Sequence, residues 1–532
     1  MNSGEMPVWK TMRHSGVAFP PEHSPTGLAV TIRGERVLLS PLADEMLYQF
    51  AKKKDTPYVR DPVFVQNFMK HLSKELPERF RGAQFSEIDL SEFHRLVDRE
   101  KQAKESIGKE EKKRLAASRK EQREALKGRY GKAIIDGVEV EIANWLVEPP
   151  GLFMGRGAHP LRGSWKPRVG PGDVTLNLDE GAPVPPSSGQ WGAIVHDAES
   201  IWFARWIDKL TGREKYVWPH EGSAIQQSRN KEKYDKALSM GPKLNTLRTK
   251  IVKAMSAKDG RTSRTATVAY LIDTLGMRVG DEKDPDEADT VGATTLRVEH
   301  VKLSDERIEF DFLGKDSVRW MKTLERPEPG LLRNLRRFTQ GKKPQDKIFD
   351  GVTSGTVNRF LSEMVPGLSA KVFRTYHATK VAEERLRSRD VRQADEIEKL
   401  YFAKEANLAA AEYCNHKRTP PKNWEESLRK KEEKLAEYRA RGKEGMARKM
   451  SLNVEFTKRT KDYNLNTSLK NYIDPRIYKS WCDHVGLEWS KLYTTSLQRK
   501  FSWVSKSRKP WPGGAEHEAP VAATVAVATQ GA

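Results

Sequence analysis

The sequence predicts a multidomain protein of the α+β class, and three observations lead to this prediction. The chain has 532 residues, enough for three or four compact units at roughly 100 to 200 residues per domain. Short apolar patches that alternate with polar residues occupy much of 1–222, whereas helix-forming sequence dominates from 223 onward. The hydrophobic fraction of 37% allows several cores, but 31% charged residues and a mean hydropathy of −0.72 indicate extended solvated faces.

The first recognisable element pair lies in residues 28–50, where apolar residues alternate on either side of Gly34. This pattern around a glycine predicts a two-stranded hairpin. A helix should follow and begin at Ser40 or Pro41, because serine caps helix N-termini and proline fits the first helical position. Residues 1–85 are therefore predicted to form a small α/β unit.

Residues 91–127 consist almost entirely of charged side chains and helix formers, with sparse apolar positions. The composition predicts one long helix, or two helices broken at Gly108. Such a charge run is usually a solvated face, and it can also form a basic projection that helps hold DNA. The sequence leaves both interpretations open.

Residues 133–222 are rich in glycine, proline and tryptophan, and strand-like runs such as AIIDGVEVEIANWLV alternate with turns. The centre of this segment combines cationic side chains with glycines that let a ligand approach the backbone. We predict phosphate contacts from Arg156, Arg162, Lys166 and Arg168. The sequence contains no strand–GxGxxG–helix frame and no GxxxxGK[ST] motif, so it does not support ATP use.

The remainder of the chain divides into four predicted segments after an N-terminal lobe at 1–222. Residues 223–419 should form a mainly helical domain with a strand pair at 294–314. Residues 420–462 predict a charged helical hairpin with few core positions, which is typical of a linker. A strong apolar set predicts a compact helical module at 463–508, and the small residues, prolines and glycines of 509–532 predict a disordered tail.

Charge and cysteine content narrow the class of protein. Lys and Arg number 94 against 73 Asp and Glu, so the net charge is +21 and the expected partner is a polyanion. Nucleic acid is the first candidate and an anionic membrane surface the second.

With only Cys414 and Cys482, a disulfide framework is excluded. We find no signal peptide, membrane span or metal-hydrolase motif, and expect a soluble intracellular protein without metal or cofactor.

Five polar residues stand in specific sequence contexts. They are Arg278 in DTLGMRVGDEK, Lys315 in EFDFLGKDSVRW, Arg374 in AKVFRTYHAT, His416 in YCNHKR and Tyr472 in LKNYIDPR. Taken singly, each residue has a structural explanation. An arginine after an apolar helix is commonly a salt-bridge partner, and a buried tyrosine commonly has a bonded hydroxyl.

Together these motifs resemble the eukaryotic type IB DNA topoisomerases. The strings FDFLGKDS, AKVFRTY, DTVG with LRVEH, and CNH followed by PPK occur in the order of that family, and the similarity extends from about Trp9 to Trp503. The resemblance implies a bilobed clamp around duplex DNA. An N-terminal mixed α/β cap lobe would face a mainly helical catalytic domain of tyrosine-recombinase-like fold, joined by a coiled-coil linker to a small helical C-terminal domain.

The resemblance also implies a set of roles that the chemistry explains. Tyr472 would attack a DNA phosphorus and keep the bond energy in a 3′-phosphotyrosyl intermediate, so that ATP is not needed. Arg278 and Arg374, with a hydrogen bond from His416, would stabilise the charge that develops on the non-bridging oxygens. Lys315 would protonate the 5′-oxygen that leaves.

Other positions match family residues beside the cleaved phosphate or in the pocket of camptothecin-type inhibitors. They are Arg156, Lys215, Asp316 and Asn471, for which structural explanations also exist: Asn471 as a cap, and Asp316 as a partner of Arg319. One departure is His377, where the family often has asparagine. We expect a monomer that binds double-stranded DNA and binds no membrane.

Two other functions remain possible from the sequence. A tyrosine recombinase shares the same catalytic residue types, but the cap-like N-terminal half and the hairpin before the tyrosine disfavour it. A non-catalytic DNA clamp would use the charge alone.

We expect nuclear localisation, or a viral particle or cytoplasmic replication site if the protein is viral. The chain should begin near the core, so only weak basic clusters at 109–114 and 505–510 are available for nuclear import.

Overall fold

The computed structural model describes residues 7–281, 288–421, 423–506 and 511. The chain divides into two compact units, with the boundary in sequence between Gln226 and Gln227. Both units contain helices and strands, which confirms the predicted mixture. None of the described helices has the length and apolar character needed to cross a membrane.

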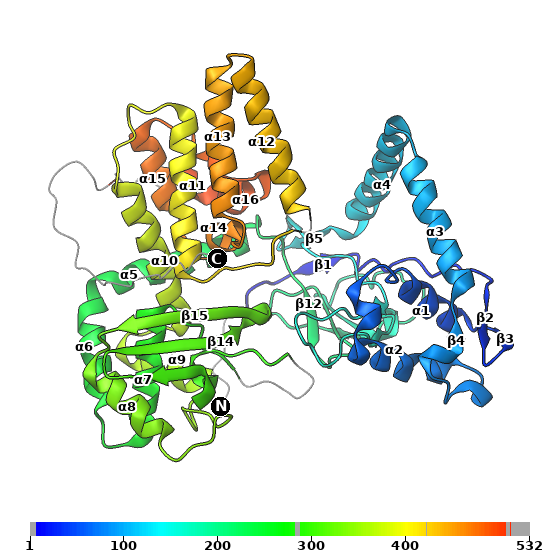
Figure 1. The fold of residues 1–532 in the computed structure, drawn as a ribbon, viewed down its shortest axis with the longest axis horizontal. Helices are drawn as coiled ribbons and strands as arrows, with labels where there is room; N and C mark the ends of the chain where they lie inside the picture. The colour runs from blue at the N-terminus through cyan, green and yellow to red at the C-terminus, as the bar shows by residue number, and fades with distance from the viewer. Residues whose placement is uncertain (1–6, 282–287, 422, 507–510, 512–532) are drawn as a thin grey trace. The chain divides into compact units, whose positions relative to one another are not determined.

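The first unit consists of short strands and helices (Figure 1). Its strands are β1 (Met12–His14), β2 (Ala29–Ile32), β3 (Glu35–Leu38), β4 (Ile88–Asp89), β5 (Lys132–Ile135), β6 (Val138–Glu141), β7 (Gly151–Leu152), β8 (Trp165–Lys166), β9 (Val174–Asn177), β10 (Ala193–Val195), β11 (Ala204–Ile207) and β12 (Glu214–Val217). Its helices are α1 (Pro41–Ala51), α2 (Pro62–Glu75), α3 (Ser91–Ser106) and α4 (Lys109–Tyr130). The sheet orders are β1-β5-β6, β3-β2-β4, β7-β8 and β10-β9-β11-β12.

The predicted hairpin in residues 28–50 is confirmed. Strand β2 pairs antiparallel with β3 around Gly34, whose φ of 82° lies in the left-handed region that favours glycine. Ser40 is the N-cap of α1, and its side chain accepts a hydrogen bond from a backbone N–H of the first turn at 3.1 Å. Phe50 of α1 stacks on Phe68 of α2 with ring centroids 4.2 Å apart, in the core beneath the sheet.

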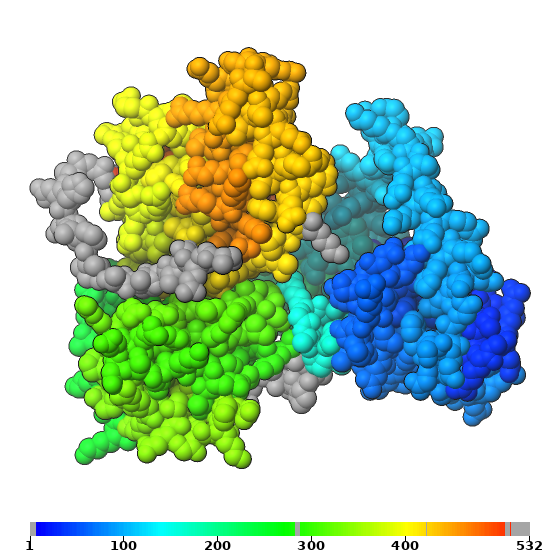
Figure 2. Space-filling model, viewed as in Figure 1, coloured from blue at the N-terminus to red at the C-terminus, as the bar shows by residue number. Residues whose placement is uncertain are grey.

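The charged segment 91–127 forms two helices that break at Gly108, the second of the two predicted alternatives. Phe93 is the one buried residue of α3, and no residue of α4 is buried. Figure 2 shows the surface of these helices (blue to cyan) extending as an arm from their own unit. The arm is therefore held by its base, while its length is exposed to solvent.

The loop from β7 to β8 packs closely on α2. At Gly163, whose φ is 87°, a Cβ atom would lie 2.0 Å from the backbone oxygen of Phe64 in α2. Only glycine permits this approach. Asn67, one turn further along α2, donates to the carbonyls of Pro160 and Arg162 at 2.7 and 2.9 Å. These contacts fix the loop that carries two of the predicted phosphate-binding arginines.

The second unit contains an antiparallel sheet and the remaining helices (Figure 1). Its strands β13 (Val301–Leu303), β14 (Arg307–Gly314) and β15 (Val318–Glu325) lie in the order β13-β14-β15. Its helices are α5 (Ala224–Met240), which spans the boundary, α6 (Leu244–Met255), α7 (Gly260–Leu275), α8 (Pro329–Thr339), α9 (Ser354–Met364), α10 (Ala370–Arg387), α11 (Glu396–Tyr413), α12 (Trp424–Ala440), α13 (Glu444–Arg459), α14 (Leu465–Asn471), α15 (Pro475–Val485) and α16 (Thr495–Lys500).

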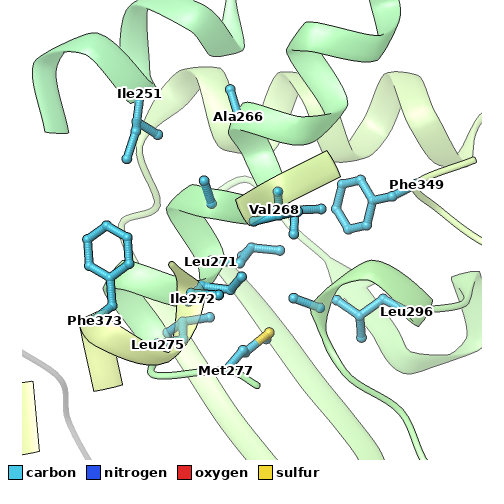
Figure 3. Close-up of a cluster of buried hydrophobic side chains, with 14 of the residues drawn as sticks. Ile251, Ala266, Val268, Leu271, Ile272, Leu275, Met277, Leu296, Phe349 and Phe373 are labelled. Carbon is cyan, nitrogen blue, oxygen red and sulfur yellow. The ribbon is translucent and has the colours of Figure 1, made fainter. Parts of the chain in front are cut away.

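The central core of this unit surrounds α7. Figure 3 shows Leu271, Ile272 and Leu275 of this helix in one apolar cluster with Phe349 and Phe373. These five side chains are at most 1% exposed. Because α7 is buried on nearly all sides, its C-terminal end is held in a fixed place, and the chain that follows leads directly to Arg278.

The strand predicted for the first part of 294–314 is wrong over most of its length. Only Val301–Leu303 is a strand there, and two 3-10 helices precede it at Ala293–Thr295 and Val298–His300. The Arg297 guanidinium pairs with Asp289 at 2.9 Å and with Glu299 at 2.7 Å. The two 3-10 helices interrupt the continuous strand that the alternating apolar pattern predicts, although Arg297 between them is extended and forms an isolated antiparallel bridge with Lys347.

The charged hairpin of α12 and α13 lies against α11 (Figure 1). Arg448 of α13 pairs with Asp395 at 2.8 Å and with Glu398 of α11 at 2.7 Å, and Arg459 pairs with Glu405. In Figure 2 the surface of the hairpin (orange) continues that of the helices before it (yellow). The two helices predicted in 420–462 are therefore present and are attached along one side.

The last helices enclose a second core of this unit, in which Trp481 and Phe501 are at most 1% exposed. The tail predicted to be disordered, residues 509–532, lies outside the described residues except for Trp511. The ring of Trp511 packs on this core, and the guanidinium carbon of Arg387 lies 5.6 Å from the ring centroid.

Candidate active site

A cavity of about 100 Å³ in the second unit brings together four of the five predicted site residues. Its lining includes Arg278, Lys315, Arg374 and His416, which come from distant parts of the chain. Lys417 also lines the cavity, and Asp316 is the acidic residue of the lining. Four cationic side chains against one carboxylate make this cavity suitable for an anion.

Arg278 reaches the cavity because α7 ends abruptly. Gly276 is the C-cap, and its φ of 65° is the left-handed conformation that stops a helix. A Cβ atom there would also lie 3.0 Å from the ring of Tyr413 in α11, so glycine lets the two helix ends approach. The pKa of Arg278 is lowered by burial and by the nearby charge of Arg374. The cavity thus holds two like charges that an anion would stabilise.

Arg374 lies on α10 and is 4% exposed. Its Nη2 donates to the carbonyl of Cys414 at 2.8 Å, and its Nη1 donates to the hydroxyl of Tyr472 at 3.4 Å. Its Nε is buried and has no hydrogen-bond partner among the described residues. A buried guanidinium without a carboxylate partner is costly, and an anion in the cavity would offset that cost.

His416 lies in the turn after α11 and is also 4% exposed. Its backbone is fixed at both ends, because its N–H donates to Ala411 at 2.9 Å and its carbonyl accepts from the N–H of Asn464 at 2.7 Å. Neither ring nitrogen has a partner within the described part of the chain. Burial and the charges of Arg374 and Arg278 lower the pKa of His416 to about 3. The imidazole is therefore neutral and has an N–H available for an acceptor.

Tyr472 follows the last residue of α14 and lies beside these two groups, although it does not line the cavity itself. Its ring centroid is 5.0 Å from that of His416 and 4.9 Å from the guanidinium carbon of Arg374. Thr379 of α10 donates its hydroxyl to the Tyr472 carbonyl at 3.2 Å and accepts the N–H of Asp474 at 3.0 Å. Thr379 thus joins the tyrosine segment to the helix that carries Arg374.

Lys315 lies at the turn between β14 and β15, in a short 3-10 helix over Lys315–Ser317. Its side chain is exposed at the edge of the cavity. Asp316 has a φ of 67° and Ser317 a φ of 57°, so the turn uses left-handed backbone at two positions. The turn that carries Lys315 therefore forms part of the cavity lining.

The three arginines of the first unit that are predicted to contact phosphate differ in their surroundings within that unit. Arg162 pairs with Asp61 through Nε at 2.5 Å, and Arg168 donates to the carbonyls of Pro20 and Pro21 at 3.0 and 3.1 Å. Arg156 is exposed in the loop between β7 and β8. The internal partners of Arg162 and Arg168 give these two residues a structural role.

The two predicted lysines of the first unit share an acidic partner. Lys166 pairs with Glu148 and, at 3.1 Å, with Asp208. Lys215 lies 3.8 Å from the same Glu148. That these five cationic residues contact DNA stays a prediction: Arg156, Arg162, Lys166, Arg168 and Lys215.

Asn471 and Asp316 belong to the second unit. The carbonyl of Asn471 accepts a hydrogen bond from Lys233 at 3.0 Å, which holds the end of α14. Arg319, the residue suggested as an alternative partner of Asp316, pairs with Asp311 at 2.6 Å. The predicted roles of Asn471 and Asp316 at a cleaved phosphate stay predictions.

Two residues that line the cavity or contact Tyr472, Lys417 and Thr379, were not predicted. Lys417 follows His416 directly, and its position after the CNH string is the signal that sequence reasoning missed. Thr379 follows Arg374 by five residues and was not distinguishable from an ordinary helical threonine. Nε2 of His377 donates to the Asp273 carboxylate at 2.6 Å, and Arg248 donates to the same carboxylate at 2.6 Å. The departure at His377 therefore has a specific local partner.

No cluster of three or more His, Cys, Asp or Glu side chains that could hold a metal ion occurs among the residues described. The cavity instead offers guanidinium, ammonium and imidazole groups as donors. Such a donor set binds the oxygens of a phosphate directly.

Comparisons with known proteins agree with this arrangement. The family model of the eukaryotic DNA topoisomerase I DNA binding fragment matches residues 7–219, and that of the catalytic core matches residues 222–449. A model of a C-terminal topoisomerase domain matches residues 445–512. DNA topoisomerase 1 of Homo sapiens is 33% identical over 544 residues, which cover 93% of this chain and 70% of that protein. The chain belongs to the eukaryotic DNA topoisomerase I family.

Other members of the family match to a similar degree. DNA topoisomerase 1 alpha of Arabidopsis thaliana is 35% identical over 540 residues, and DNA topoisomerase 1 of Candidozyma auris is 34% identical over 534 residues. The chain spans 58% of the length of the Arabidopsis relative and 70% of the Candidozyma relative. The family similarity covers 93% and 94% of this chain, so both structural units belong to the matched part.

Proposed function

We propose that this chain is a type IB DNA topoisomerase that relaxes supercoiled duplex DNA without ATP or metal. Tyr472 is the nucleophile and forms a 3′-phosphotyrosyl intermediate, the free DNA end rotates, and the strand is then rejoined. The observation that carries the proposal is the contact between the Tyr472 hydroxyl and the buried Arg374 guanidinium, beside the unpartnered imidazole of His416. Membership in the family supports the same activity.

The cleavage step follows from the groups at the cavity. The Tyr472 oxygen bonds to phosphorus and loses its proton to solvent, while the bond from phosphorus to the 5′-oxygen breaks. Arg278 and Arg374 bind the non-bridging oxygens, which gain charge in the transition state, and the neutral His416 donates its N–H to one of them. Lys315 gives a proton to the departing 5′-oxygen. Rejoining is the reverse of these steps, so the phosphodiester is restored without an energy source.

The wider assignments belong to the same proposal. The N-terminal lobe (1–222), with the arm of α3 and α4, and the catalytic domain (223–419) close around duplex DNA. The hairpin at 420–462 restrains strand rotation, and the module at 463–508 supplies the tyrosine. The net charge of +21 supports sequence-tolerant binding to the DNA backbone.

The enzyme acts as a monomer in the nucleus, and camptothecin-type inhibitors stack at the nick beside Arg156, Lys215, Asp316 and Asn471. A cleavage assay with camptothecin tests the last point, because trapped covalent complex should accumulate. No increase in trapped complex would contradict inhibitor binding at this position.

The activity is tested by incubating the protein with supercoiled plasmid in EDTA without ATP and stopping the reaction with detergent. We expect relaxed topoisomers and protein joined to the 3′ end of the nicked strand. Products of strand exchange that depend on a specific site would indicate a recombinase instead. Salt-sensitive binding without nicking or adduct would indicate a non-catalytic clamp.

A further inference from the structure

One partly buried lysine that the proposed chemistry does not use lies directly behind the cavity. Lys322 of β15 donates from Nζ to the carbonyl of Leu275 at 2.8 Å and to the carbonyl of Tyr413 at 3.2 Å. Leu275 is the last residue of α7, and Tyr413 is the last residue of α11. A single ammonium from the sheet therefore bridges the C-terminal ends of two helices.

The chemistry of helix ends explains why a cation occupies this position. The last carbonyls of a helix have no partner within the helix, and the helix dipole places partial negative charge there. Two such ends meet at Lys322, and the ring centroid of Tyr413 lies 5.0 Å from its ammonium. Burial, and secondarily the approach of Arg374, lower the pKa of Lys322 to about 8. The ammonium is thus held in a partly desolvated place by these carbonyls.

The two bridged residues lie immediately before the site residues. Arg278 follows Leu275 by three positions, and His416 follows Tyr413 by three positions. Between them, the carbonyl of Cys414 accepts the hydrogen bond from Arg374 at 2.8 Å. A shift of either helix end would therefore move the groups assigned to the non-bridging oxygens.

We infer that Lys322 is a positioning residue for DNA cleavage, which joins the ends of α7 and α11 so that Arg278 and His416 converge on one phosphate. The inference rests on the proposed function and adds a residue to it. Lys322 does not contact the reacting atoms in this assignment. It acts through the two carbonyls that it binds.

The test compares Lys322→Met, which keeps the length of the side chain and removes its donors, with Lys302→Met on β13. Lys302 is exposed on the same sheet and serves as a matched control. The readout is the single-turnover rate of covalent adduct formation on a short duplex that cannot be rejoined. We expect Lys322→Met to slow this rate about 10- to 100-fold, because small displacements of binding groups have effects of this size. DNA affinity, measured with Tyr472→Phe in both backgrounds, should change less than about twofold.

A second substrate separates positioning from proton donation. When sulfur replaces the bridging 5′-oxygen, the leaving thiolate needs no proton, because a thiol has a pKa near roughly 8.5. The defect of Lys322→Met should persist on this substrate. A defect that disappears there would make Lys322 a proton donor and overturn the inference, as would an adduct rate within about twofold of the Lys302→Met control.

If Lys322→Met does not fold, Lys322→Gln replaces it, because the amide can bind one of the two carbonyls. Folded Lys322→Gln should cleave several-fold more slowly than the parent protein, and a parent-like rate would overturn the inference. Lys322→Arg, which keeps a cation and several donors, should recover part of the rate lost in Lys322→Met. If the parent protein forms no covalent adduct, the proposed function itself is refuted. If the parent forms the adduct and the Lys322 variants form it at the parent rate, only the inference about Lys322 is refuted.

Discussion

Nη1 of Arg374 donates to the hydroxyl of Tyr472 at 3.4 Å, although 98 positions separate these residues in the sequence. The guanidinium is anchored from the other side by the carbonyl of Cys414. The nucleophile of the proposed reaction therefore lies beside a fixed cation before any DNA is bound. This contact places the phenol oxygen next to the groups that would receive the phosphate.

Replacing Arg374 should slow cleavage strongly. Arg374→Ala removes a donor to the non-bridging oxygens, and we expect a loss of about 10²–10³ in the single-turnover rate of adduct formation. Arg374→Lys should recover only part of this rate, because one ammonium does not reproduce a planar fork that binds Tyr472, Cys414 and a phosphate together. A rate for Arg374→Lys equal to that of the parent would contradict the geometry assigned here.

Because His416 is buried, the stability of the DNA-free protein should depend on pH. Its pKa is about 3 in the folded protein, against an unfolded value near roughly 6.5, so the unfolded state binds more protons between these values. Stability is therefore fully present above about pH 6.5 and is lost as the pH falls toward the folded pKa. When the pH falls from 7.5 to 5, the protonation of this one residue in the unfolded state should lower the free energy of unfolding by about 2 kcal/mol.

The measurement compares the melting temperatures of the parent and His416→Asn at pH 7.5 and 5. Asparagine keeps an N–H donor and cannot titrate, so the decrease on acidification should be smaller in the variant. Equal decreases in the two proteins would show that the histidine is not held neutral by its surroundings. His14→Asn is a useful comparison, because burial lowers the pKa of His14 to about 4 in the other unit.

Lys315 should matter only when the leaving group needs a proton. Lys315→Ala is expected to slow adduct formation on ordinary DNA by about 10²–10⁴, which is typical of general acid catalysis. With a 5′-bridging sulfur the same variant should react at nearly the parent rate. An undiminished defect on the sulfur substrate would assign Lys315 to phosphate binding instead.

Thr379 joins the nucleophile segment to α10 and should be sensitive to an isosteric change. Thr379→Val leaves the Tyr472 carbonyl and the Asp474 N–H without a partner in a buried place, which should lower stability by about 1–3 kcal/mol. Thr379→Ser keeps the hydroxyl and should melt close to the parent. Thermal melting of both variants checks this, and a valine variant as stable as the serine variant would contradict it.

The sequence allows local elements to be predicted where the signal is local. Gly34 and Ser40 mark the hairpin and the following helix, and Gly108 marks the break in the charged arm, because turns and caps depend on a few adjacent residues. The strand expected around Arg297 is wrong over most of its length because 3-10 helices stand on both sides of this residue, and alternation does not reveal them or the ion pairs of Arg297 with Asp289 and Glu299.

The site depends on contacts that no local pattern contains. Arg374 and Tyr472 could be associated only through the family motifs, since the fold brings their helices together over a long separation. Lys322 occupies an ordinary position in an alternating strand, and nothing in its neighbours indicates that it reaches the ends of α7 and α11. Arg162 and Arg168 matched a phosphate-binding pattern, whereas their partners inside the first unit depend on the packing of distant segments.

The most direct test of the proposed function is to identify the residue that is joined to DNA. After detergent trapping on a duplex, the adduct is digested with protease and nuclease, and the peptide that carries the nucleotide is sequenced by mass spectrometry. We predict a single modified peptide with a 3′-nucleotide on Tyr472, and no adduct from Tyr472→Phe that still binds DNA. Attachment to another residue, or an adduct that persists in Tyr472→Phe, would contradict the assignment of the nucleophile.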